Sequence, residues 1–263
     1  MKNLMIAKYY TFTSENERFR SLINKLTDIT PSAIVTFLQI LKFDRIFSAI
    51  INPPKDKYLS ALIFQIKWVN EFKKNQLLVL ENWKKYRCFD EIQSICRITK
   101  DSMILDVGCG ISTVLHFVEG RKFGIDPLAN EFLKLYKYPS DIKIKKGSGE
   151  RIPFLNEYFD IVYCTNVLDH VADPIKTIDE IYRVLKVNGK FVLTVDIFKE
   201  RIKRDLKHPH SFLEEDINSL VGEKFKIIFS KVTPRIGLKA YVNGVRKSDK
   251  EQFVVVMNKN LLL

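Results

Sequence analysis

Glycine and proline are scarce in this chain, which has 10 glycines and 9 prolines among 263 residues. Disordered and collagen-like chains are rich in these residues, so neither class fits. The hydrophobic fraction is 46% and the aromatic fraction 12%, which is ample material for a large core. At this length we expect one globular domain with an appended segment.

Cysteine patterns of metal or redox sites are also missing. None of the four cysteines forms a C-x-x-C pair, and no nearby histidine completes a set of metal ligands. His208 and His210 stand two positions apart, but no third ligand is apparent beside them. We therefore predict no metal site. We expect the cysteines to be free, mostly buried thiols in a reducing compartment.

No uninterrupted apolar run is long enough for a membrane span. The most apolar stretch, Ala33 to Ile51, is broken by Lys42, Asp44 and Arg45. The first eight residues hold too short an apolar run for a signal peptide. We expect a cytoplasmic protein without a transmembrane segment.

The net charge of +12 is unevenly distributed. Residues 1–100 carry a net charge of +8, residues 101–200 of −2 and residues 201–263 of +6. The basic flanks could attract nucleic acid, an anionic membrane surface or an acidic substrate. A solvated lysine-rich surface explains them equally well.

Residues 1–100 are predicted to form a helical extension. Ser14 and Glu17 fit a capping box for a first helix, and Pro31 opens a second one, which Pro53 ends. Apolar spacing predicts a third helix over about 58–72 and a fourth that contains Trp83.

Residues 101–263 are predicted to form an α/β domain, because short β-rich runs alternate with helical ones. Asp173 and Pro174 are well placed to begin a helix over 174–186. The last two strands lack a crossover helix, which favours an antiparallel strand. The fold class is thus a doubly wound, seven-stranded, mostly parallel sheet with an N-terminal helical extension. The expected strands are 103–107, 122–126, 142–145, 159–165, 190–195, 225–232 and 252–257, and the expected helices lie near 112–119, 129–137, 174–186 and 211–221.

A glycine turn separates the first strand of this domain from the helix expected after it. The segment 106–112 contains Asp106, Gly108 and Gly110, and glycines at such a turn let the backbone approach a ligand closely. Asp126 and Pro127 close the next strand, where a carboxylate can accept hydrogen bonds from both ribose hydroxyls. This spacing indicates a nucleotide-like ligand.

The same turn departs from a dinucleotide site. The G-x-G-x-x-G pattern that holds a pyrophosphate fails here, because its sixth position is Thr113. Asp106 would repel a diphosphate but could hold a cationic amino-acid group. A ligand with a ribose, an adenine and a positively charged amino-acid tail fits better than NAD.

Over residues 80–260 the sequence resembles the class I S-adenosylmethionine-dependent methyltransferases. The resemblance is carried by motifs in the family's order, at 105–110, 124–126, 147–154, 159–162, 166–171 and 182–190. It implies a Rossmann-like fold and S-adenosyl-L-methionine as cofactor. The implied cofactor-binding residues are Asp106, Gly108, Cys109 and Gly110 around the methionine part, Asp126 and Pro127 at the ribose, Ser148, Gly149 and Glu150 beside the adenine, and Asn166 beneath the sulfonium.

Two positions depart from the family's pattern. Ser112 stands where a third glycine is common, and Ser148 where an aspartate is common. A serine hydroxyl bonds an adenine amino group more weakly than a carboxylate does. These changes bear on the affinity for the cofactor rather than on its identity.

Three residues after the fourth and fifth strands are candidates for catalysis. Asp169 and His170 follow the fourth strand, where a histidine could act as general base, although a role of His170 in capping or packing the following loop is favoured slightly over catalysis. His210 lies after the fifth strand, where ligands bind in this architecture. Trp83 and Tyr86, just before the domain, could form a lid or simply pack against the sheet.

Three functions remain open. The first is a methyltransferase for a small-molecule acceptor, with hydrophobic character suggested by the apolar helices between Pro31 and Ile51. The second is a nucleic-acid methyltransferase that uses the basic flanks to bind RNA. The third is a cofactor-binding interaction module without turnover, including one that contacts a membrane surface.

Overall fold

The computed structural model describes residues 57–202, 208–244 and 251–261. The predicted capping box at Ser14 and the apolar helices between Pro31 and Ile51 lie outside the described residues.

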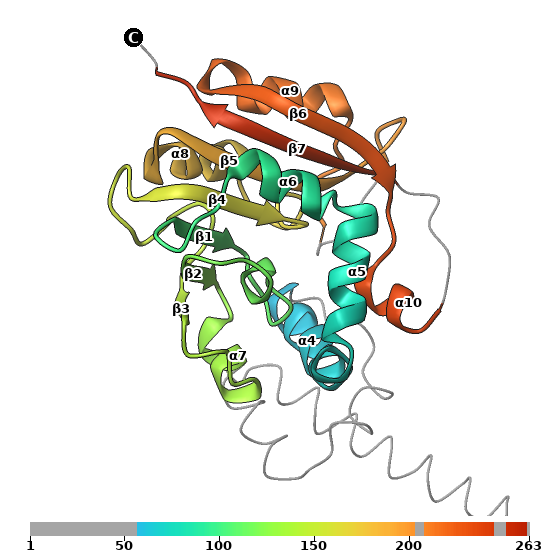
Figure 1. Ribbon diagram of the computed structural model, residues 1–263. Helices are drawn as coiled ribbons and strands as arrows, with labels where there is room; N and C mark the ends of the chain where they lie inside the picture. The colour runs from blue at the N-terminus through green and yellow to red at the C-terminus, as the bar shows by residue number, and fades with distance from the viewer. Residues whose placement is uncertain (1–56, 203–207, 245–250, 262–263) are drawn as a thin grey trace, which may run out of the picture.

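A seven-stranded sheet organises the chain (Figure 1), in the order β3-β2-β1-β4-β5-β7-β6. Its first five strands are parallel, and β7 runs antiparallel to both of its neighbours. The predicted doubly wound sheet and its antiparallel strand are therefore confirmed. The strands are β1 (Met103–Val107), β2 (Arg121–Asp126), β3 (Ile142–Lys146), β4 (Phe159–Thr165), β5 (Leu185–Ile197), β6 (Phe225–Pro234) and β7 (Glu251–Lys259).

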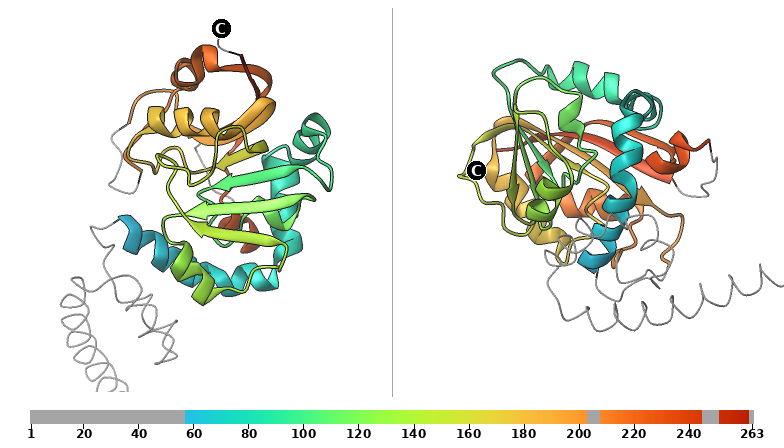
Figure 2. Two further views of the ribbon diagram at one scale, coloured as in Figure 1. Left: turned by 90° about the vertical axis from the view of Figure 1, so that its left-hand side faces the viewer. Right: turned by 90° about the horizontal axis from the view of Figure 1, so that it is seen from below.

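Helices cover both faces of the sheet, and each face has its own apolar core (Figure 2). One core holds buried side chains of α4 (Lys57–Lys74), α5 (Gln76–Tyr86), α6 (Phe89–Cys96) and α7 (Ala129–Leu135). The other holds side chains of α8 (Pro174–Val184) and α9 (Glu214–Val221). The short α10 (Leu238–Val242) lies beside α5 (Figure 1).

Helices α4, α5 and α6 belong to the sheet's own core. Trp68 and Phe72 of α4 are fully buried in the same cluster as Ile104 and Tyr163 of the sheet. The side chain of Gln93 donates a 3.1 Å hydrogen bond to the hydroxyl of Tyr163. Side chains from both sides of residue 100 thus share one core, and the division into an extension or lid over residues 1–100 and a domain over 101–263 remains a prediction.

The prediction of a helix over 112–119 is wrong, because only a single 3-10 turn, Val114–His116, forms there. Side chains satisfy the backbone that a helix would have used. The hydroxyl of Thr113 accepts from the amide of Leu115 at 3.1 Å, and the ring of His116 contacts the carbonyl of Ile111 at 3.0 Å. By contrast, α8 begins as predicted, with Asp173 accepting a 3.0 Å hydrogen bond from the amide of Lys176.

Among residues 57–202, 208–244 and 251–261, no helix has the length and apolar character needed to span a bilayer.

Candidate functional site

The candidate site lies where the parallel strands end. Asp106 lies in β1, Asp126 ends β2, and Asn166 follows β4, so all three reach the carboxyl edge of the sheet. Ligands of open α/β sheets bind at this edge, where the order of the strands reverses. Here the reversal falls between β1 and β4.

Asp106 is a buried carboxyl with an unused acceptor. Asp106 is only 1% exposed, and its Oδ2 accepts a 2.6 Å hydrogen bond from the hydroxyl of Thr113. Its buried Oδ1 has no hydrogen-bond partner in the described part of the chain. Burial raises the pKa of Asp106 to about 7, and the charge of Asp126 acts in the same direction. A cationic group beside Oδ1 would both complete its bonding and favour the charged carboxylate.

Asp126 is held by backbone amides. Its Oδ1 accepts from the amide of Leu128 at 2.9 Å, and its Oδ2 from the amide of Gly110 at 3.2 Å. Burial raises its pKa to about 6, although both amides oppose this. Each carboxylate oxygen has two lone pairs, so both oxygens retain one acceptor site for a hydroxyl. The half-buried Pro127 follows directly.

The glycine turn passes over the end of β2. The amides of Gly108 and Cys109 donate to the carbonyl of Ile125 at 2.8 and 3.0 Å. Gly108 and Gly110 adopt φ values of 69° and 53°, which side chains rarely tolerate. The thiol of Cys109 is buried, and a Cβ on Gly124 would lie 2.8 Å from its sulfur. Cys109 therefore offers a ligand only its backbone.

Gln65 of α4 contacts this turn, and the sequence analysis did not identify it. Its Oε1 accepts from the amide of Ile111 at 3.3 Å, and a Cβ on Gly110 would lie 3.1 Å from its Nε2. This amide is one that the expected helix terminus would have offered to a ligand. The only signal in the sequence is a polar residue within the apolar run of α4.

The segment between β3 and β4 is tied to the loop before α8. The Oε1 of Glu150 accepts a 2.7 Å hydrogen bond from the amide of Ala172. Burial would raise the pKa of Glu150, but backbone amides and the hydroxyl of Ser148 outweigh it, so the pKa is lowered. A Cβ on Gly149 would lie 2.7 Å from Thr177 of α8, so Gly149 permits close packing of the helix.

Asn166 lies at the end of β4 with φ 58°. Its amide donates to the carbonyl of Thr194 at 2.7 Å, which fixes its backbone against β5. Its side-chain Oδ1 accepts a 2.6 Å hydrogen bond from Nη2 of Arg235. Asn166, which is predicted to lie beneath the sulfonium, is thus hydrogen-bonded to Arg235, a contact that its sequence motif does not predict.

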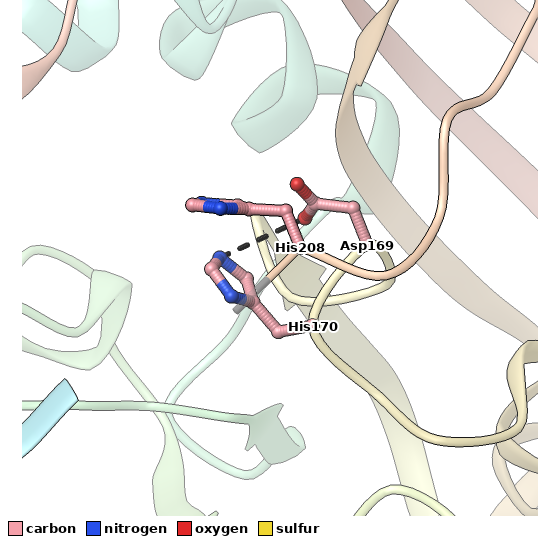
Figure 3. Close-up of side chains that lie close together, drawn as sticks. All are labelled: Asp169, His170 and His208. Carbon is pink, nitrogen blue, oxygen red and sulfur yellow. Dashed lines mark ion pairs between the residues drawn. The ribbon is translucent and has the colours of Figure 1, made fainter. Parts of the chain in front are cut away.

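Asp169, His170 and His208 form a side-chain group (Figure 3) at the carboxyl edge. Nε2 of His170 lies 3.8 Å from Oδ1 of Asp169, and the rings of His170 and His208 have centroids 4.3 Å apart. One ligand-type atom from each residue lies within 4.8 Å of the other two. The predicted His210 does not join this group, because its Nε2 lies 3.0 Å from the carbonyl oxygen of Val171.

This grouping could not be predicted from sequence, because its members come from two different loops. His208 and His210 were considered together as neighbours in the chain, whereas folding brings His208 to Asp169 and His170. The three groups can accept or pass a proton, and they are donor types that also bind metal ions.

Trp83 is buried, and the guanidinium of Arg87 lies 4.4 Å from the centre of its ring. Tyr86 packs edge-to-face against Tyr241, with centroids 6.0 Å apart. The cation on the face of Trp83 is therefore an arginine of the chain itself.

The chain is similar to known proteins over the part that carries this site. Residues 105–193 match the family model of a methyltransferase domain. An uncharacterized protein of Methanocaldococcus jannaschii is 29% identical over 219 residues, which cover 76% of this chain and 94% of that protein. A tRNA U34 carboxymethyltransferase of Campylobacter fetus is 29% identical over 138 residues, and the match spans 49% of each chain.

The fold recurs in solved structures. The YcgJ protein of Bacillus subtilis superposes with a TM-score of 0.52 at 16% identity, covering 65% of this chain and 97% of that protein. At this identity the likeness supports the fold.

Proposed function

This chain carries a class I S-adenosylmethionine-dependent methyltransferase domain, and we propose that it transfers a methyl group from S-adenosyl-L-methionine to a small-molecule acceptor. The single observation that supports this best is the orphaned acceptor on Asp106. A buried carboxyl with an unused Oδ1 suits the ammonium group of the cofactor's methionine part.

The remaining contacts follow from the same edge of the sheet. Asp126 would accept the ribose hydroxyls, with Pro127 beside it. The glycine turn at Gly108 and Gly110 would lie along the methionine part. We place the adenine beside Ser148, Gly149 and Glu150, although the carboxylate of Glu150 is already engaged with the loop before α8.

Bound there, S-adenosyl-L-methionine would supply an activated methyl group on a sulfonium. Displacement at such a group depends mainly on positioning, so the chain's chief task is to hold and orient the acceptor and to exclude water. An acceptor O–H or N–H must also lose its proton. His170 is our candidate for that base, and Asp169 would stabilise the imidazolium at 3.8 Å. His208 is the third member of this group, and His210 remains a candidate to border the acceptor from the loop after β5.

The acceptor's reacting part is expected to be polar. Arginine, asparagine, aspartate and histidine side chains surround the carboxyl edge beyond β4. A hydrophobic portion of the acceptor would have to contact other segments, such as the predicted apolar helices before residue 52. We also propose a cytoplasmic location.

Calorimetric titration with S-adenosylmethionine and S-adenosylhomocysteine tests the cofactor. We expect both to bind to the full-length protein and Asp106→Asn to weaken binding. Asp101→Asn is a matched control, because the Asp101 carboxyl is 91% exposed and lies before β1. If neither ligand binds the unmodified protein, this proposal fails.

A second candidate is an RNA methyltransferase. It is supported by the similarity to the tRNA U34 carboxymethyltransferase of Campylobacter fetus and by the net charge of +12. It predicts RNA binding that weakens steeply with salt. Binding of a basic protein releases cations from the RNA phosphates, and added salt opposes this release. A gel-shift series at increasing salt, with a labelled tRNA pool, separates it from the small-molecule proposal.

The third alternative, a binding module without turnover, makes a different prediction. Such a protein would bind the cofactor but would transfer no labelled methyl group to any component of a cell extract. Identification of a labelled product would exclude it and would name the acceptor.

A further inference from the structure

Two arginines from distant segments lie at the carboxyl edge beyond β4, near enough for the charge of Arg235 to act on Arg87. Because β5 and β6 are both antiparallel to β7, they run in the same direction, and Pro234 at the end of β6 reaches the edge where Ile197 ends β5. Arg235 follows directly.

Arg87 reaches the same edge from the end of α5. The carbonyl of Tyr86 is fixed there by two donors: the hydroxyl of Thr233 in β6 at 2.7 Å and the side chain of Gln252 in β7 at 3.1 Å. The residue after Tyr86 is therefore held over the ends of these strands.

Arg235 is held in a defined orientation. Its Nε pairs with Oδ1 of Asp196 at 2.5 Å, and its Nη2 donates to Oδ1 of Asn166 at 2.6 Å. The side chains of Arg235 and Asp196 are 16% and 9% exposed. Two of its nitrogens are thus committed to the chain, while the rest of the planar fork remains available to an acceptor group.

Arg87 is buried without a comparable partner. The residue is 5% exposed, and its guanidinium rests on the ring of Trp83. Within residues 57–202, 208–244 and 251–261, no acceptor takes a hydrogen bond from this guanidinium. Burial lowers the pKa of Arg87 to about 9, and the charge of Arg235 adds to this, while Asp196 and Asp106 oppose it. A buried cation that is stacked but not hydrogen-bonded has unused donors.

The charges at this edge favour a further anion once a cationic cofactor is present. Arg235 is balanced by Asp196, but the guanidinium of Arg87 has no such ion pair. Asn166, to which Arg235 is bonded, is the residue proposed to lie beneath the sulfonium. Two guanidinium groups and a sulfonium would repel one another unless negative charge lay between them.

We propose that Arg87 and Arg235 together bind an anionic group, a carboxylate or a phosphate, carried by the methyl acceptor. This inference rests on the proposed methyltransferase function and specifies the class of its substrate. The planar fork of arginine matches both anions, which it can bind through two parallel hydrogen bonds.

The position in the sheet assigns the anion to the acceptor rather than to the cofactor. In the order β3-β2-β1-β4-β5-β7-β6, the proposed cofactor contacts Asp126 and Asp106 lie in β2 and β1. Arg235 lies at the end of β6, on the opposite side of Asn166. The adenosine and Arg235 therefore flank the end of β4 from opposite directions.

Trp83 provides a direct readout that needs no knowledge of the acceptor. The chain has two tryptophans, so a Trp68→Phe background leaves Trp83 as the only one. The probes are inorganic phosphate, acetate and neutral acetamide, titrated against the full chain with and without S-adenosylhomocysteine. We expect a saturable change in Trp83 fluorescence with at least one anion and none with acetamide.

Variants identify the donors. Arg87→Gln and Arg235→Gln should each weaken anion binding by about tenfold or more, as expected for loss of a charged hydrogen bond. Arg121→Gln should not, because Arg121 begins β2 at the opposite edge and its side chain is 65% exposed. Arg87→Gln should also leave the melting temperature unchanged or raised, since it removes a buried charge without an ion-pair partner. A purely structural role for Arg87 predicts a lower melting temperature and unchanged anion binding, which would overturn the proposal.

One further arm separates the acceptor from the cofactor. 5′-Methylthioadenosine lacks the amino-acid part of the cofactor. If phosphate or acetate competes with S-adenosylhomocysteine but not with 5′-methylthioadenosine, the arginines bind the cofactor's own carboxylate and the proposal is wrong. Failure of S-adenosylhomocysteine to bind the unmodified protein would instead remove the proposed function, whatever the anions do.

Discussion

The hydroxyl of Thr113 donates a 2.6 Å hydrogen bond to Oδ2 of Asp106. The residue that breaks the dinucleotide pattern is thus the one that orients the carboxyl at the centre of the site. A glycine at position 113 would leave both oxygens of Asp106 without a side-chain donor. Thr113, which departs from G-x-G-x-x-G, and the buried carboxyl of Asp106 are therefore linked directly by a hydrogen bond.

Thr113→Val should weaken the binding of S-adenosylhomocysteine. Valine keeps the shape of threonine but removes the donor, which raises the pKa of Asp106 further and makes the charged form less available. We expect a loss of about tenfold or more in affinity by calorimetry, the size of one hydrogen bond to a charged group. Thr99→Val is a matched control, because among the described residues the hydroxyl of Thr99 bonds the nearby hydroxyl of Ser102, away from the carboxyl edge. Equal affinities for Thr113→Val and the unmodified protein would contradict this role.

The stability of the ligand-free protein should fall between about pH 4 and pH 7. Burial raises the pKa of Asp106 to about 7 and that of Asp126 to about 6. The native state then binds more protons than the unfolded state, so the stability that these groups contribute at low pH is lost as pH rises through their native pKa values. Thermal melts across this range should show the decline, and Asp106→Asn should make it shallower. A decline of the same size in Asp106→Asn would place its origin elsewhere.

The affinity for S-adenosylhomocysteine should change with pH in the opposite sense. A cationic amino group favours the charged carboxylate, so binding should strengthen as pH rises from 5.5 to 7.5, a window set by the native pKa values of about 6 and about 7. Calorimetry in buffers of different ionisation enthalpy should detect protons released on binding. Proton uptake would be inconsistent with this geometry.

Gly110→Ala and Gln65→Ala should be strongly coupled. Alanine at position 110 must adopt a left-handed φ of 53° and also approach Nε2 of Gln65 at 3.1 Å. Shortening Gln65 removes the second problem but not the first. The loss of unfolding free energy in the double variant, measured by urea unfolding, should therefore be smaller than the sum of the two single losses, by about 0.5 kcal/mol or more. Strict additivity would show that Gln65 does not constrain the turn.

His170→Gln should lower the rate of methyl transfer to an acceptor that loses a proton. Removing a general base reduces such a rate by roughly 10²–10⁴-fold, and the loss should appear in kcat rather than in cofactor affinity. His210→Gln is the comparison, because its ring contacts the carbonyl of Val171 outside the group. If both variants keep full activity in labelled transfer assays, His170 has a packing role.

Chelation should leave methyl transfer unchanged. The sequence predicts no metal site, and the close group of Asp169, His170 and His208 can be explained as a proton-transfer relay. Activity measured after dialysis against EDTA provides the check. Suppose instead that EDTA removes the activity and that added zinc or magnesium restores it in the unmodified protein but not in Asp169→Asn. That result would identify this group as a metal centre.

Periodicity in the sequence located most of the fold. The expected strands 103–107 and 159–165 coincide with β1 and β4, because buried parallel strands are continuous apolar runs. The helix expected over 112–119 failed because it was inferred from its place after a strand. Thr113 and His116 bond their own backbone, and Gln65 takes an amide from the turn, so a single 3-10 turn forms.

Sequence predicted the site residues that stand in recognisable motifs at strand ends, and it did not predict the others. Asp106, Asp126 and Asn166 lie at or just beyond the carboxyl ends of β1, β2 and β4, so their common position is a consequence of parallel topology. Gln65, Arg87 and Arg235 have no such marker, since α4, α5 and β6 can bring any residue to the edge. His208 was paired in the sequence with its neighbour His210, yet it meets His170.

By itself, the sequence determined the doubly wound sheet, the glycine turn and the two acids beside it, because each depends on local spacing and on the fixed direction of parallel strands. Only the tertiary structure decided which side chains from distant segments complete the edge. It left Oδ1 of Asp106 buried without a partner, placed Arg235 on Asn166, and set Arg87 against Trp83. Those contacts depend on how helices pack across the ends of strands, and that packing is set by the shape and burial of the whole core.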